Sequence, residues 1–238
     1  MRLNKDYWLL NKPVAHRGLW GDEIIENSIT AYRNAVEKGY PIEIDVYVTK
    51  DDKLVSFHDK TLKRMTGADG FVYEKTLAEL KELRLAGTDE QIPTFDEVLA
   101  ICENKTPILI EIKDQPNNTV VEKVIERLKS YKGEFALQSF NPLYIKKVKK
   151  LAPSFIRGIL GRHDAKNKSA FTRLIVKKML LNFLIKPDFI SYSYKGIPKY
   201  TKKSKKIPVI AWTVTSAEIE KTVRPYINNI IFEHYIPQ

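Results

Sequence analysis

Short apolar segments alternate with helical patterns along most of the chain, and this alternation restricts the fold more than any other feature. The segments are rich in Val, Ile and Phe, and polar turns or amphipathic stretches separate them, as strands joined by helices require. We expect eight strands, at residues 13–18, 42–48, 107–113, 135–140, 156–160, 188–194, 208–214 and 229–233. The expected helices lie at 28–38, 77–83, 94–104, 119–131, 142–151, 169–185 and 217–226. Such an order is typical of an α/β protein, and eight repeats favour a TIM (β/α)8 barrel.

One stretch interrupts the regular order after the second strand. Residues 54–58 form a short extended piece, and residues 59–91 contain three glycines around one expected helix, which predicts a small insertion at about 59–91. A chain of 238 residues has the length of one barrel, so we predict a single domain over 1–238. Because the sequence ends almost at its eighth strand, either the last barrel helix is missing or residues 7–10 pack in its place.

The composition limits the cellular location and the classes of partner that we expect for this chain. The net charge of +11, from 40 Lys and Arg against 29 Asp and Glu, suits phosphorylated substrates or anionic lipid, although lysine-rich soluble enzymes share it. The sequence contains no zinc-finger spacing or RNP-like motif, so we expect no nucleic-acid partner. Cys102 lies in an apolar helical run and is predicted to be a buried structural thiol. Since the sequence contains no signal peptide or membrane-spanning run, we expect a cytoplasmic location.

Three acidic residues in apolar strands form the first chemical signal. Glu43 and Asp45 are two residues apart, so they point to the same side of a strand, and the intervening apolar residues face the helices. Glu111 has the same arrangement on the next barrel strand. Buried carboxylates repel one another unless a cation lies between them. We therefore predict one divalent cation, Mg²⁺ or Ca²⁺ with Mn²⁺ as a third candidate. The alternative is that the acids are solvated strand ends or form structural ion pairs with Arg17 and Lys113.

Two histidines are expected beside the acids. His16 ends the first strand, and His58 ends the short extended piece. An imidazole titrates near pH ~6.5, which suits general acid and base catalysis. Arg17 and Lys113 add fixed positive charge, which suits an anionic phosphoryl oxygen. The pattern favours transfer of a group that carries anionic oxygen, and it leaves open which histidine is the acid and which the base.

An ordered set of motifs resembles the glycerophosphodiester phosphodiesterase family, of the bacterial cytoplasmic type. The resemblance runs from residue 15 to residue 213. Its motifs are Ala15-His-Arg-Gly18, Glu26-Asn-Ser28 leading to Ala31-Tyr32, Glu43-Ile-Asp-Val46, Phe57-His-Asp59, Leu62, Thr66-Gly67, Ile92-Pro-Thr94, Glu111-Ile-Lys113, Gln138-Ser-Phe140 and Ala211-Trp-Thr213.

This resemblance implies a TIM barrel with a short insertion and a metal-dependent hydrolase of lipid and glycerol metabolism. It implies that a glycerol hydroxyl attacks phosphorus to give a cyclic phosphate, which water opens, so that glycerol 3-phosphate and an alcohol such as choline or ethanolamine are released. By motif, the implied roles are metal ligands for Glu43, Asp45 and Glu111, acid and base for His16 and His58, phosphate binding for Arg17 and Lys113, and support of the first loop for Glu26 and Asn27. Trp212 is by analogy a wall of the site, or else a core tryptophan, and Gln138 is an inward-facing candidate.

Two features depart from the family or add to it. Phe232 and Glu233 stand where many members have Thr and Asp, which affects the eighth-strand side of the site. Residues 171–186 form a basic amphipathic pattern, which is either a barrel helix with a solvated lysine face or a helix in peripheral contact with an anionic membrane. Membrane contact would favour a lysophospholipase D-like activity, and a non-catalytic protein that binds anionic lipid is a further alternative. The sequence does not define the oligomeric state.

Overall fold

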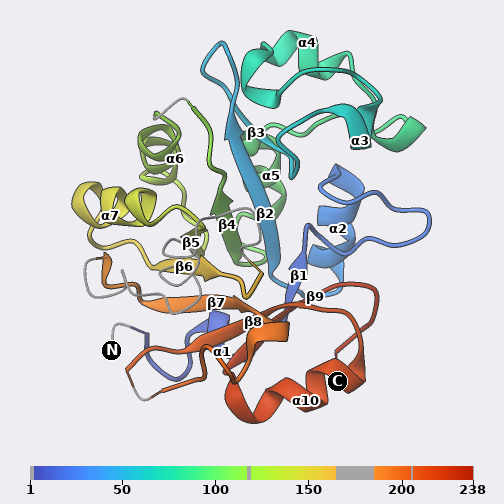
Figure 1. Cartoon of the computed structure of the whole chain (residues 1–238). Helices are drawn as coiled ribbons and strands as arrows, with labels where there is room; N and C mark the ends of the chain where they lie inside the picture. Colours follow the sequence, from blue (N-terminus) through green and yellow to red (C-terminus); the bar gives the residue numbers. More distant parts are fainter. Residues whose placement is uncertain (1–2, 117–118, 165–184, 205, 238) are drawn as a thin grey trace. The chain divides into compact units, whose positions relative to one another are not determined.

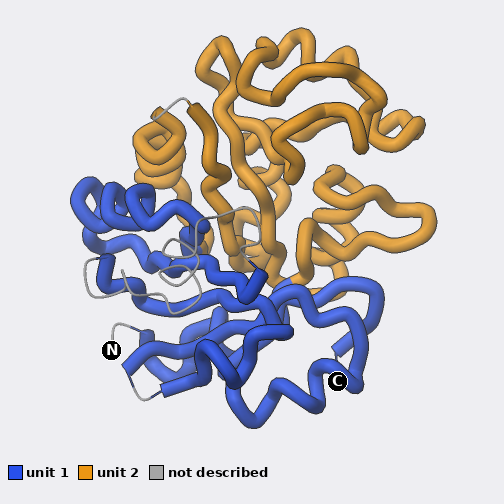
Figure 2. Tube along the Cα trace, in the orientation of Figure 1, with its two compact units in different colours: residues 1–14, 136–238 blue, residues 15–135 orange. Residues whose placement is uncertain are grey.

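The computed structural model describes residues 3–116, 119–164, 185–204 and 206–237. Eight parallel strands alternate with helical connections as a TIM barrel, and one further strand, β3, pairs antiparallel with β2 (Figure 1). The predicted fold class is confirmed. By contacts along the chain the structure divides into two compact units, residues 15–135 and residues 1–14 with 136–238, which are described separately (Figure 2). The prediction that the chain is a single domain stays a prediction.

Residues 15–135 contain the first barrel strands and the insertion. The barrel strands here are β1 (Val14–His16), β2 (Ile42–Val48) and β4 (Ile108–Ile112), and both β1 and β4 pair in parallel with β2. The helices α2 (Ile29–Glu37), α5 (Phe95–Cys102) and α6 (Val120–Leu128) follow them. Helix α5 begins with a capping box, since Thr94 Oγ accepts from the Glu97 N–H and the Glu97 carboxylate accepts from the Thr94 N–H.

The predicted insertion follows β3 (Leu54–Ser56), which reverses direction along the last residues of β2. It contains α3 (Lys63–Thr66), η1 (Val72–Glu74), α4 (Leu77–Lys81) and η2 (Leu85–Gly87). In Figure 1 α3 and α4 lie together near the end of β2. Their apolar side chains share a buried cluster with Tyr47 of β2, so the insertion is built onto the strand that carries Glu43 and Asp45.

The other unit contains the remaining barrel strands. These are β5 (Phe135–Ser139), β6 (Arg157–Gly161), β7 (Phe189–Ser193), β8 (Val209–Val214) and β9 (Asn229–Phe232), each parallel to the next. The helical elements described here are α7 (Pro142–Leu151), η3 (Tyr194–Gly196), α10 (Ala217–Val223) and η4 (Arg224–Tyr226). The helix expected at 169–185 lies outside the described residues except for its last residue, and the basic amphipathic pattern at 171–186 lies outside them except for its last two. No described helix combines the length and the apolar character that crossing a bilayer requires.

A short N-terminal helix covers the last strand. Helix α1 (Trp8–Asn11) contacts β9, and the Asn229 side-chain amide donates to the carbonyl oxygens of Leu9 and Lys12 at 2.9 and 2.6 Å. We expected either a missing last barrel helix or packing of residues 7–10 in its place. The structure shows the N-terminal segment packed against the last strand. Phe232 is buried in β9 with its ring edge against Tyr235, and Glu233 lies just beyond the strand.

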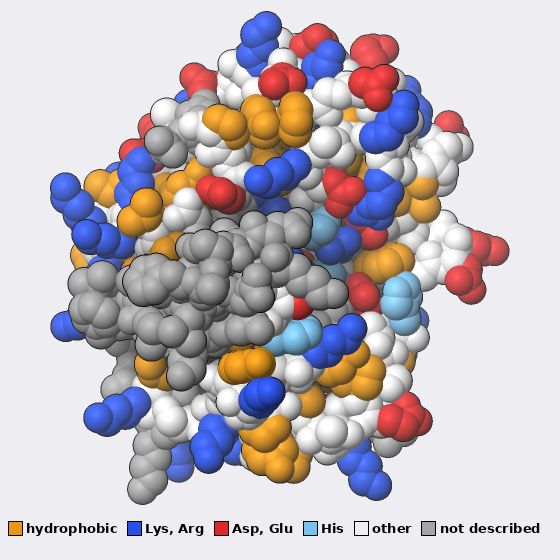
Figure 3. All heavy atoms as spheres, in the orientation of Figure 1, with side chains coloured by type: hydrophobic (Ala, Val, Ile, Leu, Met, Phe, Trp, Pro, Cys, Tyr) orange, Lys and Arg blue, Asp and Glu red, His pale blue; other side chains and the backbone are white. Residues whose placement is uncertain are grey.

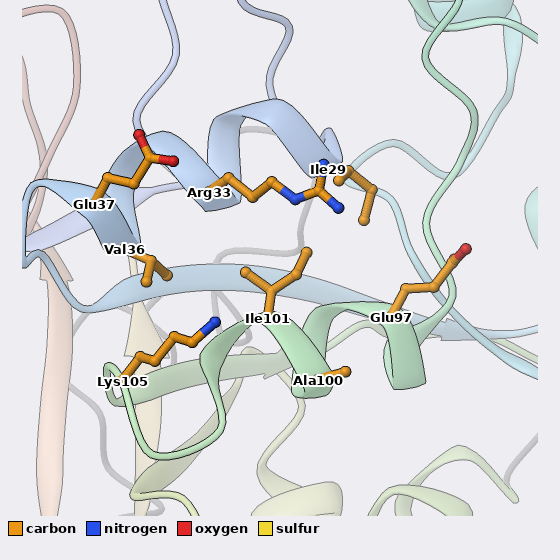
Figure 4. A pocket seen from close by; sticks show the side chains of 8 residues that line it. All are labelled: Ile29, Arg33, Val36, Glu37, Glu97, Ala100, Ile101 and Lys105. Carbon is orange, nitrogen blue, oxygen red and sulfur yellow. The ribbon is translucent and has the colours of Figure 1, made fainter.

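A hollow between α2 and α5 lies apart from the predicted chemistry (Figure 4). Polar and apolar side chains share its lining, and none of them is a predicted site residue. The lining residues are Ile29, Arg33, Val36, Glu37, Glu97, Ala100, Ile101 and Lys105.

Cys102 has the environment predicted for a structural thiol. It is fully buried near the end of α5, and burial raises the pKa of its thiol to about 12. Since the thiolate is the reactive form, we expect the native protein to react with a thiol reagent at pH 8 far more slowly than the denatured protein does. Colorimetric thiol titration with and without denaturant measures this, and equally fast labelling in both would contradict the buried placement.

Candidate active site

The strand register brings the three predicted carboxylates together. Asp45 of β2 lies opposite Glu111 of β4, and Glu43 lies opposite His16 of β1 on the other edge of β2. All three acids are at least nine-tenths buried, and each has a carboxylate oxygen within 4.8 Å of the others. The period-2 pattern of the sequence produces this cluster, since the intervening isoleucines point the other way.

Two cationic side chains partly neutralise the acids. The Lys113 ammonium lies 2.8 Å from Glu111 Oε1 and 3.1 Å from Asp45 Oδ1. Arg17 donates its backbone N–H to Glu43 Oε2 at 3.2 Å, and its Nε lies 3.8 Å from Asp45 Oδ2. Burial alone would lower the pKa of Lys113, but it is raised because Asp45 and Glu111 favour the charged form.

If all three acids are ionised, their negative charges outnumber the positive charges of Arg17 and Lys113. Burial raises the pKa of Glu43 well above its usual value, and the charges of Asp45 and Glu111 raise it further. Burial also raises the pKa of Glu111. For Asp45 the effect of burial is outweighed by Lys113, which lowers its pKa below the usual range. Three oxygen donors with unbalanced charge fit a hard divalent cation.

A buried series of hydrogen bonds fixes the position of the Asp45 carboxylate. The Asn27 amide donates to Asp45 Oδ2 at 3.1 Å, and Tyr32 Oη donates to Asn27 Oδ1 at 2.8 Å. Ser56 Oγ lies 2.7 Å from the same tyrosine oxygen. The supporting place predicted for Asn27 thus has a physical basis. Sequence reasoning missed the supporting contacts of Tyr32 and Ser56, because they come from α2 and β3 without any periodic relation to the acids.

The loop after β1 has an unusual backbone that aims Arg17 at the acids. Arg17 has φ +60° and Gly18 has φ +85°, and a Cβ at Gly18 would lie only 2.8 Å from the backbone carbon of Ala31. The Arg17 carbonyl accepts from the Asn27 N–H at 3.0 Å. Glu26 Oε1 lies 2.8 Å from Arg17 Nη1, so the predicted supporting residue pairs directly with a predicted phosphate ligand.

Both predicted catalytic histidines lie near the acids. The Phe57 N–H donates to the Asp45 carbonyl at 3.0 Å, which fixes the chain immediately before His58. His58 Nδ1 lies 2.6 Å from Asp59 Oδ1. Burial lowers the pKa of His58, and the charges of His58 and His16 both contribute to the lowered pKa of Asp45.

The remaining predicted residues belong to the other unit. Gln138 is buried and accepts a hydrogen bond from Ser191 Oγ at 2.7 Å. The Trp212 ring packs edge-on against Phe140, with ring centroids 5.5 Å apart, and its Nε1 is buried without a hydrogen-bond partner among the described residues. Their places in the site stay predictions. On the face drawn in Figure 3 lysine and arginine side chains are interspersed with acidic ones.

Comparison with known proteins identifies the family of this chain. The model of the glycerophosphoryl diester phosphodiesterase family matches residues 16–236. A glycerophosphodiester phosphodiesterase of Caldanaerobacter subterraneus is 39% identical over 163 residues, which span 62% of this chain and 65% of that protein. A lysophospholipase D of Rattus norvegicus is 36% identical over 138 residues, which span 52% of this chain and 43% of that protein.

Among solved structures, an Oleispira antarctica phosphodiesterase in complex with the product sn-glycerol-3-phosphate superposes with a TM-score of 0.75. The match covers 95% of this chain and 94% of that one at 23% identity, so it shows a shared fold. A TIM barrel with this family match defines a class of phosphoric diester hydrolases. The chain belongs to the glycerophosphoryl diester phosphodiesterase family.

Proposed function

We propose that this protein hydrolyses glycerophosphodiesters to glycerol 3-phosphate and an alcohol with the help of one divalent cation. The observation that carries the proposal is the buried cluster of Glu43, Asp45 and Glu111, beside two histidines and two cationic side chains. The relative named a glycerophosphodiester phosphodiesterase and the neighbour with bound sn-glycerol-3-phosphate support the same substrate class.

The three carboxylates would hold the cation. Mg²⁺, Ca²⁺ and Mn²⁺ all accept oxygen ligands, and the bound ion would supply positive charge for a phosphoryl oxygen. Arg17 and Lys113 would bind the other phosphate oxygens, since both side chains already lie against the cluster.

The histidines would move the protons. In the first step a glycerol hydroxyl attacks phosphorus, the bond to the alcohol oxygen breaks, and the proton passes from the attacking hydroxyl to one histidine while the other protonates the leaving oxygen. Water then opens the cyclic phosphate, with the two histidines exchanging their roles as acid and base, and this gives glycerol 3-phosphate. Asp59 accepts at His58 Nδ1, which leaves Nε2 to take the first proton, and His16 is then the acid.

A substrate panel tests the proposal. Glycerophosphocholine, glycerophosphoethanolamine and lysophosphatidylcholine are incubated with the protein and Mg²⁺, Mn²⁺ or Ca²⁺, and a parallel series contains EDTA. We expect glycerol 3-phosphate from at least the two soluble diesters with metal, and a loss of activity with EDTA. If no diester is cleaved with any of these metals, the proposal fails.

Lysophospholipase D-like activity is the second candidate, because three relatives, from rat, human and mouse, carry that name. The lysophosphatidylcholine arm decides it, since that reaction releases choline and leaves lysophosphatidic acid. Release of choline from the lysolipid faster than from glycerophosphocholine would favour this second activity. Binding of anionic lipid with no cleavage of any diester would favour the non-catalytic alternative.

A further inference from the structure

Arg64 joins two acidic residues that lie far apart in the sequence. It lies on α3 of the insertion, and its guanidinium contacts both oxygens of Asp59, with Nε 2.6 Å from Oδ2 and Nη2 2.9 Å from Oδ1. The same Nη2 lies 2.6 Å from Glu26 Oε1, in the loop after β1. Paired hydrogen bonds between a guanidinium and a carboxylate fix the orientation of both groups.

Each of these acids also holds a residue of the proposed active site. Asp59 Oδ1 lies 2.6 Å from His58 Nδ1, and Glu26 Oε1 lies 2.8 Å from Arg17 Nη1. Arg64 is therefore the common partner in a continuous chain of contacts that runs from His58 to Arg17. The two ends of this chain are the proposed base and a proposed phosphate ligand.

The charged groups in this series of contacts favour the ionised forms of Asp59 and Glu26, which the hydrogen bonds require. Burial alone would raise the pKa of Asp59, but hydrogen bonds from Arg64 and His58 lower it to about 2. Glu26 likewise has a lowered pKa, since Arg64 and Arg17 outweigh its burial. An ionised Asp59 accepts a hydrogen bond from the Nδ1–H of His58, and this tautomer leaves Nε2 free to take a proton.

Helix α3 is itself fixed, so Arg64 starts from a defined position. Leu62, the N-cap residue of α3, and Met65, which follows Arg64 in the helix, are buried in the apolar cluster of the insertion. The same cluster contains Phe57, the residue before His58. Gly67 ends α3 with φ +74°, and the Leu62 N–H donates to the Gly70 carbonyl at 3.0 Å.

We propose that Arg64 is a positioning residue for the reaction: by holding Asp59 and Glu26 it orients the His58 imidazole and the Arg17 guanidinium. This inference rests on the proposed function, because it takes His58 as a group that moves a proton. It gives the insertion a part in catalysis, since the insertion supplies the arginine on which both contacts depend. The competing explanation is that these ion pairs only stabilise α3.

The first test compares Arg64→Ala with a matched variant on the same helix. Lys63→Ala removes an ion pair with Asp69 in which both side chains are mostly exposed. We expect Arg64→Ala to lower kcat for glycerophosphocholine about 10–100-fold, since a misplaced base loses its alignment, while Lys63→Ala stays near the wild-type value. Arg64→Lys should remain impaired, because an ammonium cannot form the paired contact with Asp59. If both Arg64 variants keep the wild-type kcat, the inference is overturned.

A second test separates positioning from stability. Because the Arg64 side chain is about half exposed (48%), guanidinium ions added well below denaturing concentrations should restore part of the kcat of Arg64→Ala but none of that of His58→Ala. In a double-mutant cycle, Arg64→Ala should lower kcat less in the Asp59→Asn background than in the wild type, since the route from Arg64 to His58 runs through Asp59 and only the contact with Glu26 remains.

The outcomes separate the positioning role from the proposed function. Additive losses in the cycle, or a loss of melting temperature with kcat unchanged, would overturn the positioning role and leave the proposed function standing. Wild-type protein that cleaves no diester would instead overturn the proposed function. If Arg64→Ala does not fold, Arg64→Gln, which has a shorter, uncharged side chain with one amide donor group, replaces it in every comparison.

Discussion

Replacing His58 by alanine should lower kcat for glycerophosphodiester hydrolysis by about 10²–10⁴-fold, the usual contribution of a general acid or base. The imidazole is partly exposed and its described hydrogen bond is to Asp59, so its removal should leave the core and the melting temperature nearly unchanged. Steady-state release of glycerol 3-phosphate from glycerophosphocholine, with saturating metal, measures the effect.

The pH profile adds a second readout to this prediction. Burial lowers the pKa of His58, so its neutral form persists to lower pH, and the acid limb of kcat/KM should lie below pH ~6.5 in the wild-type protein. Lys60→Ala changes an exposed neighbouring side chain and should retain both the rate and the profile. A folded His58→Ala protein with the wild-type kcat would rule out His58 as a proton-transfer group.

Glu43→Gln should abolish metal-dependent activity and raise the stability of the metal-free protein. Loss of one charged ligand removes several kcal/mol of transition-state stabilisation, so kcat should fall by about 10³-fold. The introduced amide would still present an oxygen to the Arg17 N–H, which keeps the local hydrogen bond. Thermal melting of both proteins, in EDTA and with added Mn²⁺, measures the stability effect.

The direction of the stability change follows from the raised pKa of Glu43. A carboxyl group with a folded-state pKa above its unfolded value stabilises the fold below about pH 4.5, and this contribution is lost as pH rises through the folded pKa. At pH 8 in EDTA the variant should therefore melt at a higher temperature than wild type. With Mn²⁺ present wild type should gain melting temperature and the variant should not. Glu37→Gln, on the exposed side of α2, serves as the control, and an equal Mn²⁺-induced shift in Glu43→Gln would contradict the predicted ligand set.

The sequence predicted those parts of the site that depend on strand periodicity. Glu43 and Asp45 could be placed on one face because side chains alternate along a strand, and the parallel pairing of β2 with β4 brings Glu111 beside them. The bounds of the expected strands also differ from the observed bounds by no more than two residues. Capping and fraying decide where a strand ends on this scale.

Contacts between separate segments could not be read from the same pattern. Tyr32 and Ser56 meet Asn27 only because α2, β3 and the first loop converge, and Arg64 reaches Asp59 and Glu26 from an insertion without a regular period. The left-handed backbone at Arg17 likewise lies next to the tight approach of Gly18 to Ala31, a contact between separate segments. These interactions depend on tertiary packing, and a single sequence carries no local signal for them.

A catalytic metal is tested most directly by titrating the metal-free protein with Mn²⁺ while heat of binding and release of glycerol 3-phosphate are measured on the same preparation. We expect one binding site per chain, activity that rises with its occupancy, and loss of both in Glu43→Gln. Hydrolysis at the full rate in the metal-free protein, or unchanged Mn²⁺ binding in Glu43→Gln, would contradict a catalytic metal at Glu43, Asp45 and Glu111.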